Sequence, residues 1–405
     1  MTTEKKGIFY FLVFKYRNYR TKILKLYICP EKMSEKILHI VSFDNPYPPN
    51  YGGVIDVYYK LKALHEIGLA IHLHCFVKEI PNEFDELKKL CQSIYFYEIT
   101  SNPFHFFSSL PFSVISRGDR RLAENIAKTE APILFEGLKT TCSVYDSRLK
   151  NHKKILRLQN IEEDYFNGIS KSENSLLKKI AFKLEAMKYI KYKDVFSKFD
   201  EVVTLSKFEN EMALKFCKRA MYVPVFHGND TVLPLEGFGE YAIYHGDLNT
   251  SDNRKCVVFL IDVFRKLPHR KLVIASGSNE DFVQRLIGSS ENIQFVKLND
   301  FEQLKEMLQK SHISISWSFQ KSGTKLKAIN SLFNTRFCII NENIIDDPVV
   351  SDLCVMTKNE EELIVQIEIL FEQSFSDYPK RREILENYMN DTNNALKIEK
   401  LIYHE

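Results

Sequence analysis

The sequence predicts an α/β protein of two doubly wound, Rossmann-like domains that face each other across a cleft. Apolar runs short enough to be buried strands alternate with amphipathic helical segments along nearly the whole chain. The alternation is interrupted by a stretch with several glycines, residues 228–239, and then restarts. A length of 405 residues is sufficient for two domains that each bury a substantial core.

The charge is distributed unevenly. Residues 1–32 carry eight Lys or Arg and two Glu, a net charge of 8 − 2 = +6, so the remaining chain sums to 3 − 6 = −3. Residues 33–405 thus carry no excess positive charge, which argues against nucleic acid as a partner. The eight cysteines show no CxxC pair and no metal-ligand spacing, and no acidic cluster suggests a metal site. The cysteines therefore indicate reduced thiols in a cytoplasmic protein.

Residues 1–32 form a basic N-terminal extension that contains the apolar stretch GIFYFLVF. Its eight residues are too few to cross a bilayer, which takes roughly 20. Two interpretations stay open. The extension rests on the inner, anionic face of a membrane as a peripheral contact, or it has no structural role. We favour the second interpretation, because the stretch MSEKILHIVSF, which begins at Met33, is a more regular start for the first domain.

The first domain is assigned to residues 33–232. A strand over 36–41, the loop SFDNPYPPNYGG, a helix over 54–68 and a strand over 70–76 form a βαβ unit. Ser206 is expected to cap a helix that begins at Lys207. A long helix is expected over about 173–199. The segment 102–114, with four phenylalanines and two prolines, is expected to be irregular, with its aromatic side chains filling the core rather than forming an acceptor wall.

The second domain is assigned to residues 233–385, and residues 386–405 to a C-terminal helix. Its most informative stretch is SFQKSGTKLKAINSLFNTRFCIIN, which predicts a loop, a helix and a buried strand after the strand over 313–317. A helix N-terminus with a glycine and several lysines favours a bound phosphate. A solvated basic loop is the alternative.

Four stretches in this order resemble those of GT-B glycosyltransferases, specifically the bacterial nucleotide-sugar transferases called family 4. They are PYPPNYGG, LRLQNIEEDYF, YHGDLNTSDNRKC and GTKLKAINSLFNTRFCII. One departure concerns two glutamates, eight positions apart, that members of the family usually carry. Ser322 and Asn330 occupy those positions here.

The resemblance implies a nucleotide diphosphate sugar as donor, and no metal or other cofactor. Negative charge that develops on the leaving diphosphate must be stabilised. We assign this role to cationic side chains and backbone amides, and expect Asn330 to contact the donor ribose. The predicted donor-binding residues are Gly52, Gly53, Arg254, Gly323, Thr324, Lys325, Lys327 and Asn330.

A general base must deprotonate the acceptor hydroxyl. Asp44, Glu136 and Glu162 each follow a predicted strand of the first domain, and Glu136 is expected at the rim of the cleft. Each could instead be a helix cap or an ion-pair partner. The predicted activity is transfer of a hexosyl or related group to a glycan, lipid-linked or small-molecule acceptor. An inactive binding or accessory protein of the same fold is the alternative, and an epimerase of that fold is less favoured.

Overall fold

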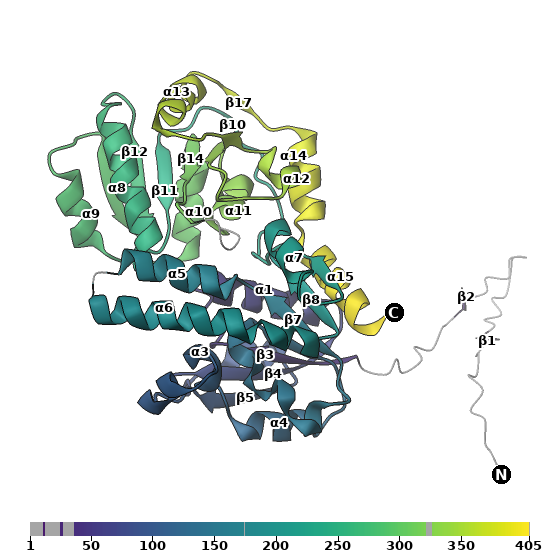
Figure 1. The fold of residues 1–405 in the computed structure, drawn as a ribbon. Helices are drawn as coiled ribbons and strands as arrows, with labels where there is room; N and C mark the ends of the chain where they lie inside the picture. Colours follow the sequence, from purple (N-terminus) through teal and green to yellow (C-terminus); the bar gives the residue numbers. More distant parts are fainter. Residues whose placement is uncertain (1–10, 13–24, 27–35, 174, 321–325, 405) are drawn as a thin grey trace, which may run out of the picture.

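The computed structural model describes residues 11–12, 25–26, 36–173, 175–320 and 326–404. Two α/β domains lie one above the other (Figure 1). Most of the N-terminal extension lies outside the described residues, apart from an antiparallel pairing of β1 (Phe11–Leu12) with β2 (Lys25–Leu26). None of the described helices combines the length and apolarity that crossing a bilayer requires.

The first domain is built on a parallel sheet of seven strands in the order β5-β4-β3-β6-β7-β8-β9. Its central strands are almost completely buried, because helices cover both faces and most of their residues are apolar. The strands are β3 (Ile37–Ser42), β4 (Ala70–Val77), β5 (Ser93–Glu98), β6 (Ile133–Glu136), β7 (Lys154–Leu158), β8 (Glu201–Thr204) and β9 (Ala220–Tyr222).

The helices of this domain are α1 (Gly52–Glu66), α2 (Asp85–Leu90), α3 (Phe112–Ile115), α4 (Arg120–Ile126), α5 (Glu162–Ser172), α6 (Leu176–Lys191) and α7 (Lys207–Ala213). Short 3-10 helices span Pro103–Phe107, Leu138–Tyr145, Ser147–Leu149 and Tyr192–Lys198. Ser206 caps α7 as predicted, since its hydroxyl accepts a hydrogen bond from the Glu209 amide at 3.1 Å.

The second domain repeats the architecture with six parallel strands in the order β13-β12-β11-β14-β15-β16. These are β11 (Ala242–His245), β12 (Leu272–Ser276), β13 (Ile293–Lys297), β14 (Ile313–Ser316), β15 (Phe337–Ile340) and β16 (Val355–Met356). Its helices are α8 (Ser251–Arg265), α9 (Glu280–Ile287), α10 (Phe301–Lys310), α11 (Leu326–Asn334), α12 (Pro348–Ser351) and α13 (Glu360–Phe371). The prediction of two doubly wound parallel sheets is confirmed.

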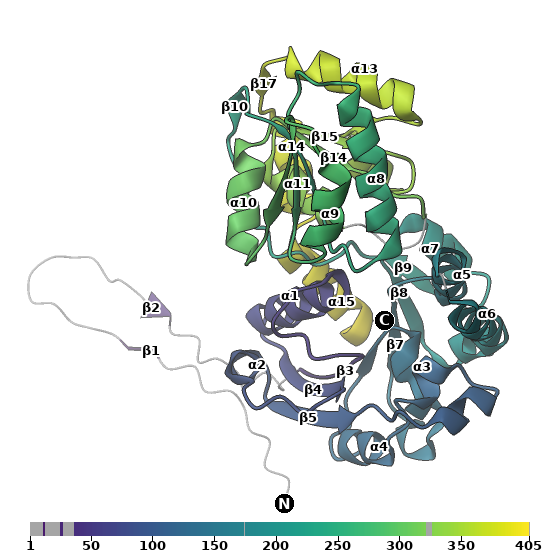
Figure 2. The ribbon, with the colours of Figure 1, turned by 90° about the vertical axis from the view of Figure 1, so that its left-hand side faces the viewer.

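The C-terminal segment leaves the second domain and returns to the first. β10 (Glu236–Gly237) pairs with β17 (Phe375–Ser376), and α14 (Pro379–Glu383) continues into a π-helix over Ile384–Tyr388. The last helix, α15 (Asp391–Tyr403), packs against α1, as Figure 2 shows. Its Ala395, Ile398 and Ile402 belong to the core of the first domain. The two domains are therefore tied together at two places along the chain.

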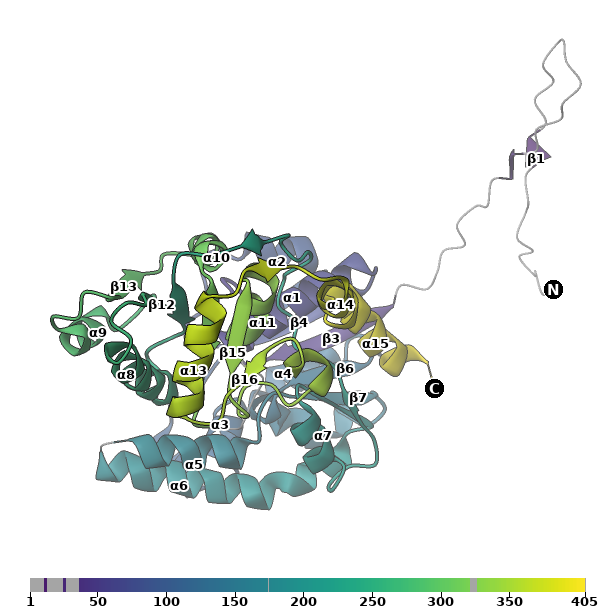
Figure 3. The same cartoon turned by 90° about the horizontal axis from the view of Figure 1, so that it is seen from above.

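Two segments differ from the predictions. Residues 102–114 contain a 3-10 helix and α3, and three of their four phenylalanines are exposed rather than in the core. The long helix expected over about 173–199 is α6 followed by a 3-10 helix, and α5 precedes it as an unpredicted partner. Figure 3 shows α5 and α6 side by side at the edge of the first domain.

Candidate functional site

The carboxyl ends of the two sheets meet at the interface between the domains. Gly52 begins α1 after β3, and Leu326 begins α11 after β14. A Cβ atom on Gly52 would lie 3.7 Å from Leu326 Cδ1. Farther along the interface, a Cβ on Gly168 of α5 would lie 2.9 Å from Nε2 of the Gln320 side chain. In parallel sheets, ligands bind at the loops that follow the carboxyl ends of the strands. Here these loops of the two domains face each other.

The loop after β3 carries Asp44, which is half-buried. The Tyr51 hydroxyl donates a hydrogen bond to Asp44 Oδ2 at 2.7 Å. Burial, together with this carboxylate, raises the pKa of Tyr51 well above its usual value. Arg117 donates from Nε and Nη2 to the Phe43 carbonyl, at 3.2 Å in each case. Asp44 therefore lies in a polar cluster at the loop between β3 and α1.

Glu162 is the first residue of α5, and its side chain is only 3% exposed. Lys139 Nζ lies 3.8 Å from Oε1, while Oε2 has no hydrogen-bond partner among the described residues. Burial raises the pKa of Glu162, although the charges of Lys139 and Arg117 oppose the shift. A buried carboxylate with a raised pKa is suited to accept a proton near neutral pH.

Lys139 connects Glu162 to the Asp44 loop. Its ammonium lies 5.8 Å from the centre of the Phe43 ring and 5.5 Å from that of Tyr165. Lys139 and Arg117 do not stand out in the sequence, because neither lies directly after a strand or within a recognisable motif. Only their spatial approach to the loops after β3 and β7 identifies them.

Glu136 does not lie at the rim of the cleft, contrary to the prediction. It is fully buried, with Lys60 Nζ 2.9 Å from Oε1 and Gln159 Nε2 3.3 Å from Oε2. Burial raises the pKa of Glu136, although Lys60 opposes this. Burial alone would also raise the pKa of Asp56, but Lys60 and Arg157 lower it to about 2. A carboxylate held in this way is an internal ion-pair partner.

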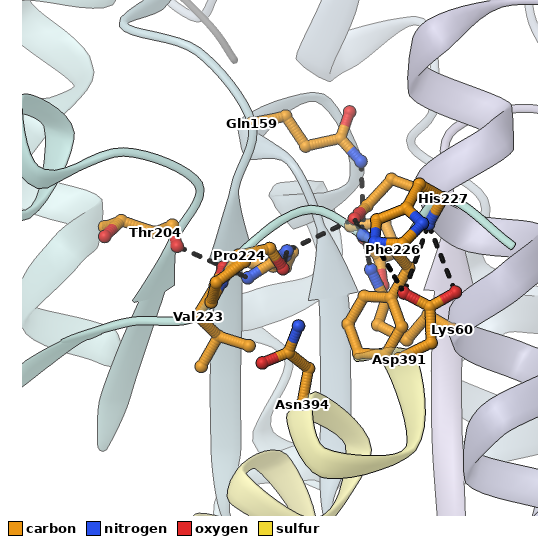
Figure 4. A network of polar contacts seen from close by, with 12 residues as sticks. Lys60, Gln159, Thr204, Val223, Pro224, Phe226, His227, Asp391 and Asn394 are labelled. Carbon is orange, nitrogen blue, oxygen red and sulfur yellow. Dashed lines mark hydrogen bonds and ion pairs between the residues drawn. The ribbon is translucent and has the colours of Figure 1, made fainter. Parts of the chain in front are cut away.

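This buried network holds the chain where it leaves the first domain (Figure 4). Arg157 donates to the carbonyls of Val223 at 2.8 Å and Pro224 at 3.0 Å. Asp56 accepts from the Phe226 amide at 2.9 Å. Asp391, the first residue of α15, accepts from the His227 amide at 3.2 Å. The charges therefore anchor both chain crossings between the domains.

On the second-domain side, Lys327 lies at the carboxyl edge of the sheet. Its ammonium donates to the Tyr244 hydroxyl at 3.2 Å, Asn253 Oδ1 at 3.1 Å and the Trp317 carbonyl at 3.1 Å. It also lies 4.7 Å from the centre of the Tyr244 ring. The sequence predicts a phosphate-facing cation at this position, and that role stays a prediction. In the structure the Lys327 ammonium joins the ends of β11, β14 and α8.

Arg254, in the first turn of α8, donates to the carbonyls of Leu248 at 2.9 Å and Asn249 at 2.8 Å. It therefore shapes the loop between β11 and α8. Beside it, Asp252 accepts from the Ser318 hydroxyl at 2.7 Å and the Phe319 amide at 3.0 Å. The loops after β11 and β14 are thus joined through side chains.

Asn330 is buried, and its Oδ1 accepts a hydrogen bond from Asn229 Nδ2 at 2.9 Å. It therefore contacts the chain that links the two domains. His245, at the end of β11, donates from Nε2 to the Lys327 carbonyl at 3.2 Å, and burial lowers its pKa to about 4. The predicted donor residues Gly323, Thr324 and Lys325, together with Ser322, lie outside the described residues.

No protein-family model matches the chain. An uncharacterised 44.6 kDa protein in the cps region of Klebsiella pneumoniae is 26% identical over 363 residues, covering 84% of this chain and 90% of that protein.

Several solved structures resemble about nine tenths of the chain. A glycosyltransferase from Rickettsia africae superposes with a TM-score of 0.57 at 17% identity, over 92% of this chain and all of that one. The lipopolysaccharide outer core galactosyltransferase WaaB gives 0.56 at 12% identity, over 90% and 99%. The S. aureus TarM G117R mutant, in complex with fondaparinux, α-GlcNAc-glycerol and UDP, gives 0.55 at 10% identity, over 92% and 97%. The chain has the GT-B fold, as the sequence motifs predicted.

Proposed function

We propose that this protein is a glycosyltransferase that moves a sugar from a nucleotide diphosphate sugar to a hydroxyl group of a glycan, lipid-linked or small-molecule acceptor. The proposal rests mainly on the meeting of two sheet edges at Gly52 and Leu326, with the buried Glu162 carboxylate on the first-domain side. The GT-B neighbours, one of which was solved with UDP and a GlcNAc derivative, support this class of reaction.

In this reaction the bond between the anomeric carbon and the diphosphate breaks, and the diphosphate leaves with the electron pair. The acceptor oxygen forms the new bond, and its proton passes to a base. We assign that base to Glu162, because Glu136 is held by Lys60 and Asp44 already accepts a hydrogen bond from Tyr51. The raised pKa of Glu162 suits this role.

The leaving diphosphate needs positive charge and hydrogen-bond donors. We assign the first-turn amides of α1, at Gly52 and Gly53, because Tyr51 at its N-cap makes no side-chain capping bond. Lys325 remains a predicted phosphate contact. Lys327 and Arg254 act on the phosphate site by holding the surrounding loops in place.

These groups supply charge without a metal, so we expect turnover to persist in EDTA. We place the reaction in the cytoplasm. Each of the seven cysteines among the described residues is a free thiol, which agrees with a reducing compartment.

An inactive GT-B binding or accessory protein is the second candidate. It is favoured by Asn330, which occupies a position where the resemblance has a glutamate and is engaged with Asn229. To separate the two, the purified protein is incubated with a panel of nucleotide sugars, with and without acceptors, and the released nucleoside diphosphate is measured. Release that depends on an acceptor supports transfer. Thermal stabilisation by a nucleotide without release supports the accessory function.

A further inference from the structure

Helix α6 presents an apolar surface away from the protein core. Leu176, Ile180, Leu184 and Met187 follow one another at helical spacing, and each is at least 50% exposed. Leu177 is 81% exposed and Ile190 is 53% exposed. Contiguous exposed apolar surface of this kind usually marks an interaction site. In Figures 1 and 3, α6 lies beside α5 at the outer edge of the first domain.

The one acidic residue of α6 points inward, together with the buried side chains of Ala186 and Tyr189. Glu185 is buried and accepts hydrogen bonds from the amides of Phe112 at 2.8 Å and Ser113 at 2.9 Å, and from the Ser113 hydroxyl at 2.8 Å. Rotating the helix to bury its leucines would expose this carboxylate and leave those donors unpaired. The outward apolar stripe is therefore a stable feature of the fold.

A second element extends the apolar surface. The 3-10 helix over Pro103–Phe107 exposes Phe104 by 75% and Phe107 by 88%. Lys188 of α6 donates from Nζ to the Phe106 carbonyl at 2.8 Å, so the two elements are joined. We call the outward side of α6 together with this 3-10 helix the α6 face. Its aromatic and aliphatic side chains are of the types that enter a lipid interface.

Positive charge surrounds these apolar side chains. Residues 176–191 contain five lysines and only Glu185, a net charge of 5 − 1 = +4. Lys178, Lys183 and Lys191 are exposed. Two copies of this surface would repel each other, which disfavours a dimer formed through it. Apolar side chains bordered by lysines complement a bilayer whose headgroups are anionic.

We propose that the α6 face docks on an anionic lipid bilayer, with α6 lying in the plane of the interface. Leucine, isoleucine, methionine and phenylalanine side chains enter the boundary between headgroups and acyl chains, while the lysines contact lipid phosphates. Docking would place α5, which begins at Glu162, close to the membrane. Lipid binding does not depend on the proposed transfer reaction, and the two can therefore fail independently. This orientation favours a lipid-linked molecule as the acceptor substrate.

The test is cosedimentation of the full-length protein with sucrose-loaded vesicles. One set contains phosphatidylcholine alone, and the other contains phosphatidylcholine with phosphatidylglycerol. We expect binding to the anionic vesicles that weakens as salt is added. The variant with Leu177→Gln, Ile180→Gln, Leu184→Gln and Met187→Gln should bind at least about tenfold more weakly. Glutamine preserves helix propensity, and thermal unfolding by circular dichroism checks the fold.

The matched control is Val365→Gln with Ile369→Gln on α13, where the apolar side chains are 54% and 50% exposed. It should bind as the wild type does. A wild-type protein that does not sediment with anionic vesicles overturns the proposal, as does a quadruple variant that binds as well as the wild type. Sedimentation velocity provides a further check, because a wild-type dimer that the quadruple variant loses would assign the α6 face to self-association.

Discussion

Lys60 and Glu136 form an ion pair in the interior of the first domain, with Lys60 Nζ 2.9 Å from Glu136 Oε1 and neither side chain exposed. The pair connects α1 to the end of β6, and Lys60 also donates to Asp56 at 2.7 Å. Through Asp56 and Arg157 the network reaches the chain that enters the second domain. A carboxylate that sequence reasoning assigned to catalysis thus belongs to the structural connection between the domains.

Replacing Lys60 by methionine should destabilise the protein by about 3–5 kcal/mol, because Asp56 and Glu136 would remain buried without their shared cation. Urea unfolding measures the change. The control is Lys62→Met on the same helix, where the side chain is 45% exposed and its ammonium lies 3.9 Å from Glu66 Oε1. That variant should lose no more than about 0.5 kcal/mol. Equal losses in both variants would contradict the network.

Replacing Glu162 by glutamine should lower kcat by roughly 10²–10⁴-fold while leaving nucleotide binding intact, because the amide cannot accept the acceptor proton. In the wild type, burial raises the pKa of Glu162. Activity should therefore fall on acidification at a pH above 4.5, the ordinary value for glutamate, and the variant should lack this dependence. Glu163→Gln, at a side chain paired with Lys193, is the control and should retain activity. Full activity of Glu162→Gln would remove the assignment.

The double variant Lys325→Ala with Lys327→Ala should weaken binding of a nucleoside diphosphate at least about tenfold, or about 1.4 kcal/mol. For Lys327 the structure supplies a reason, because its ammonium joins Tyr244, Asn253 and Trp317 around the predicted phosphate site. Isothermal titration calorimetry measures the affinity. Lys310→Ala, an exposed position at the end of α10, should bind normally. If the folded double variant bound the nucleoside diphosphate as tightly as the wild type, the donor site would have to lie elsewhere.

Stability should decrease as pH falls from 6.5 to about 4, because burial lowers the pKa of His39 from 6.5 to about 4. His39 and His74 form a directed chain that requires both rings to be neutral. Tyr97 donates to His74, His74 to His39, and His39 to the Thr129 carbonyl, at 2.9, 3.1 and 3.0 Å. In this window the unfolded chain binds more protons than the native one, which favours unfolding.

The loss attributable to His39 is at most about 3 kcal/mol over the window. Urea unfolding across a pH series measures it. His39→Gln should flatten the dependence even if it lowers stability at neutral pH. His65→Gln, at an exposed position in the last turn of α1, should retain the wild-type slope. A wild-type stability that does not change over this range would contradict the neutral chain.

Much of the fold could be predicted because strands and helices leave local patterns. The strand expected over 70–76 is β4 (Ala70–Val77), and the strand over 313–317 is β14 (Ile313–Ser316). Ser206 was identified as a cap from its position before a helical segment. The order of four motifs was enough to predict the GT-B fold.

The site could be predicted only in part. Asp44, Glu136 and Glu162 were equal candidates for the base, because each follows a predicted strand. Their surroundings in the structure differ. Glu136 meets Lys60, which is 76 positions away, whereas Glu162 retains an oxygen without a partner among the described residues. Burial and partner distance distinguish an ion-pair carboxylate from a candidate base, and neither quantity is visible in one stretch of sequence.

By itself the sequence determined the alternation of strands and helices, the presence of two domains and the positions of their loops, since these depend on residues close together along the chain. Only the tertiary structure decided that Glu136 is an internal ion-pair partner, that Lys327 joins three elements, and that α6 directs its leucines outward. The physical reason is that burial and charge pairing depend on contacts between residues far apart in the chain. Asp391 and His227, 164 positions apart, are one such pair.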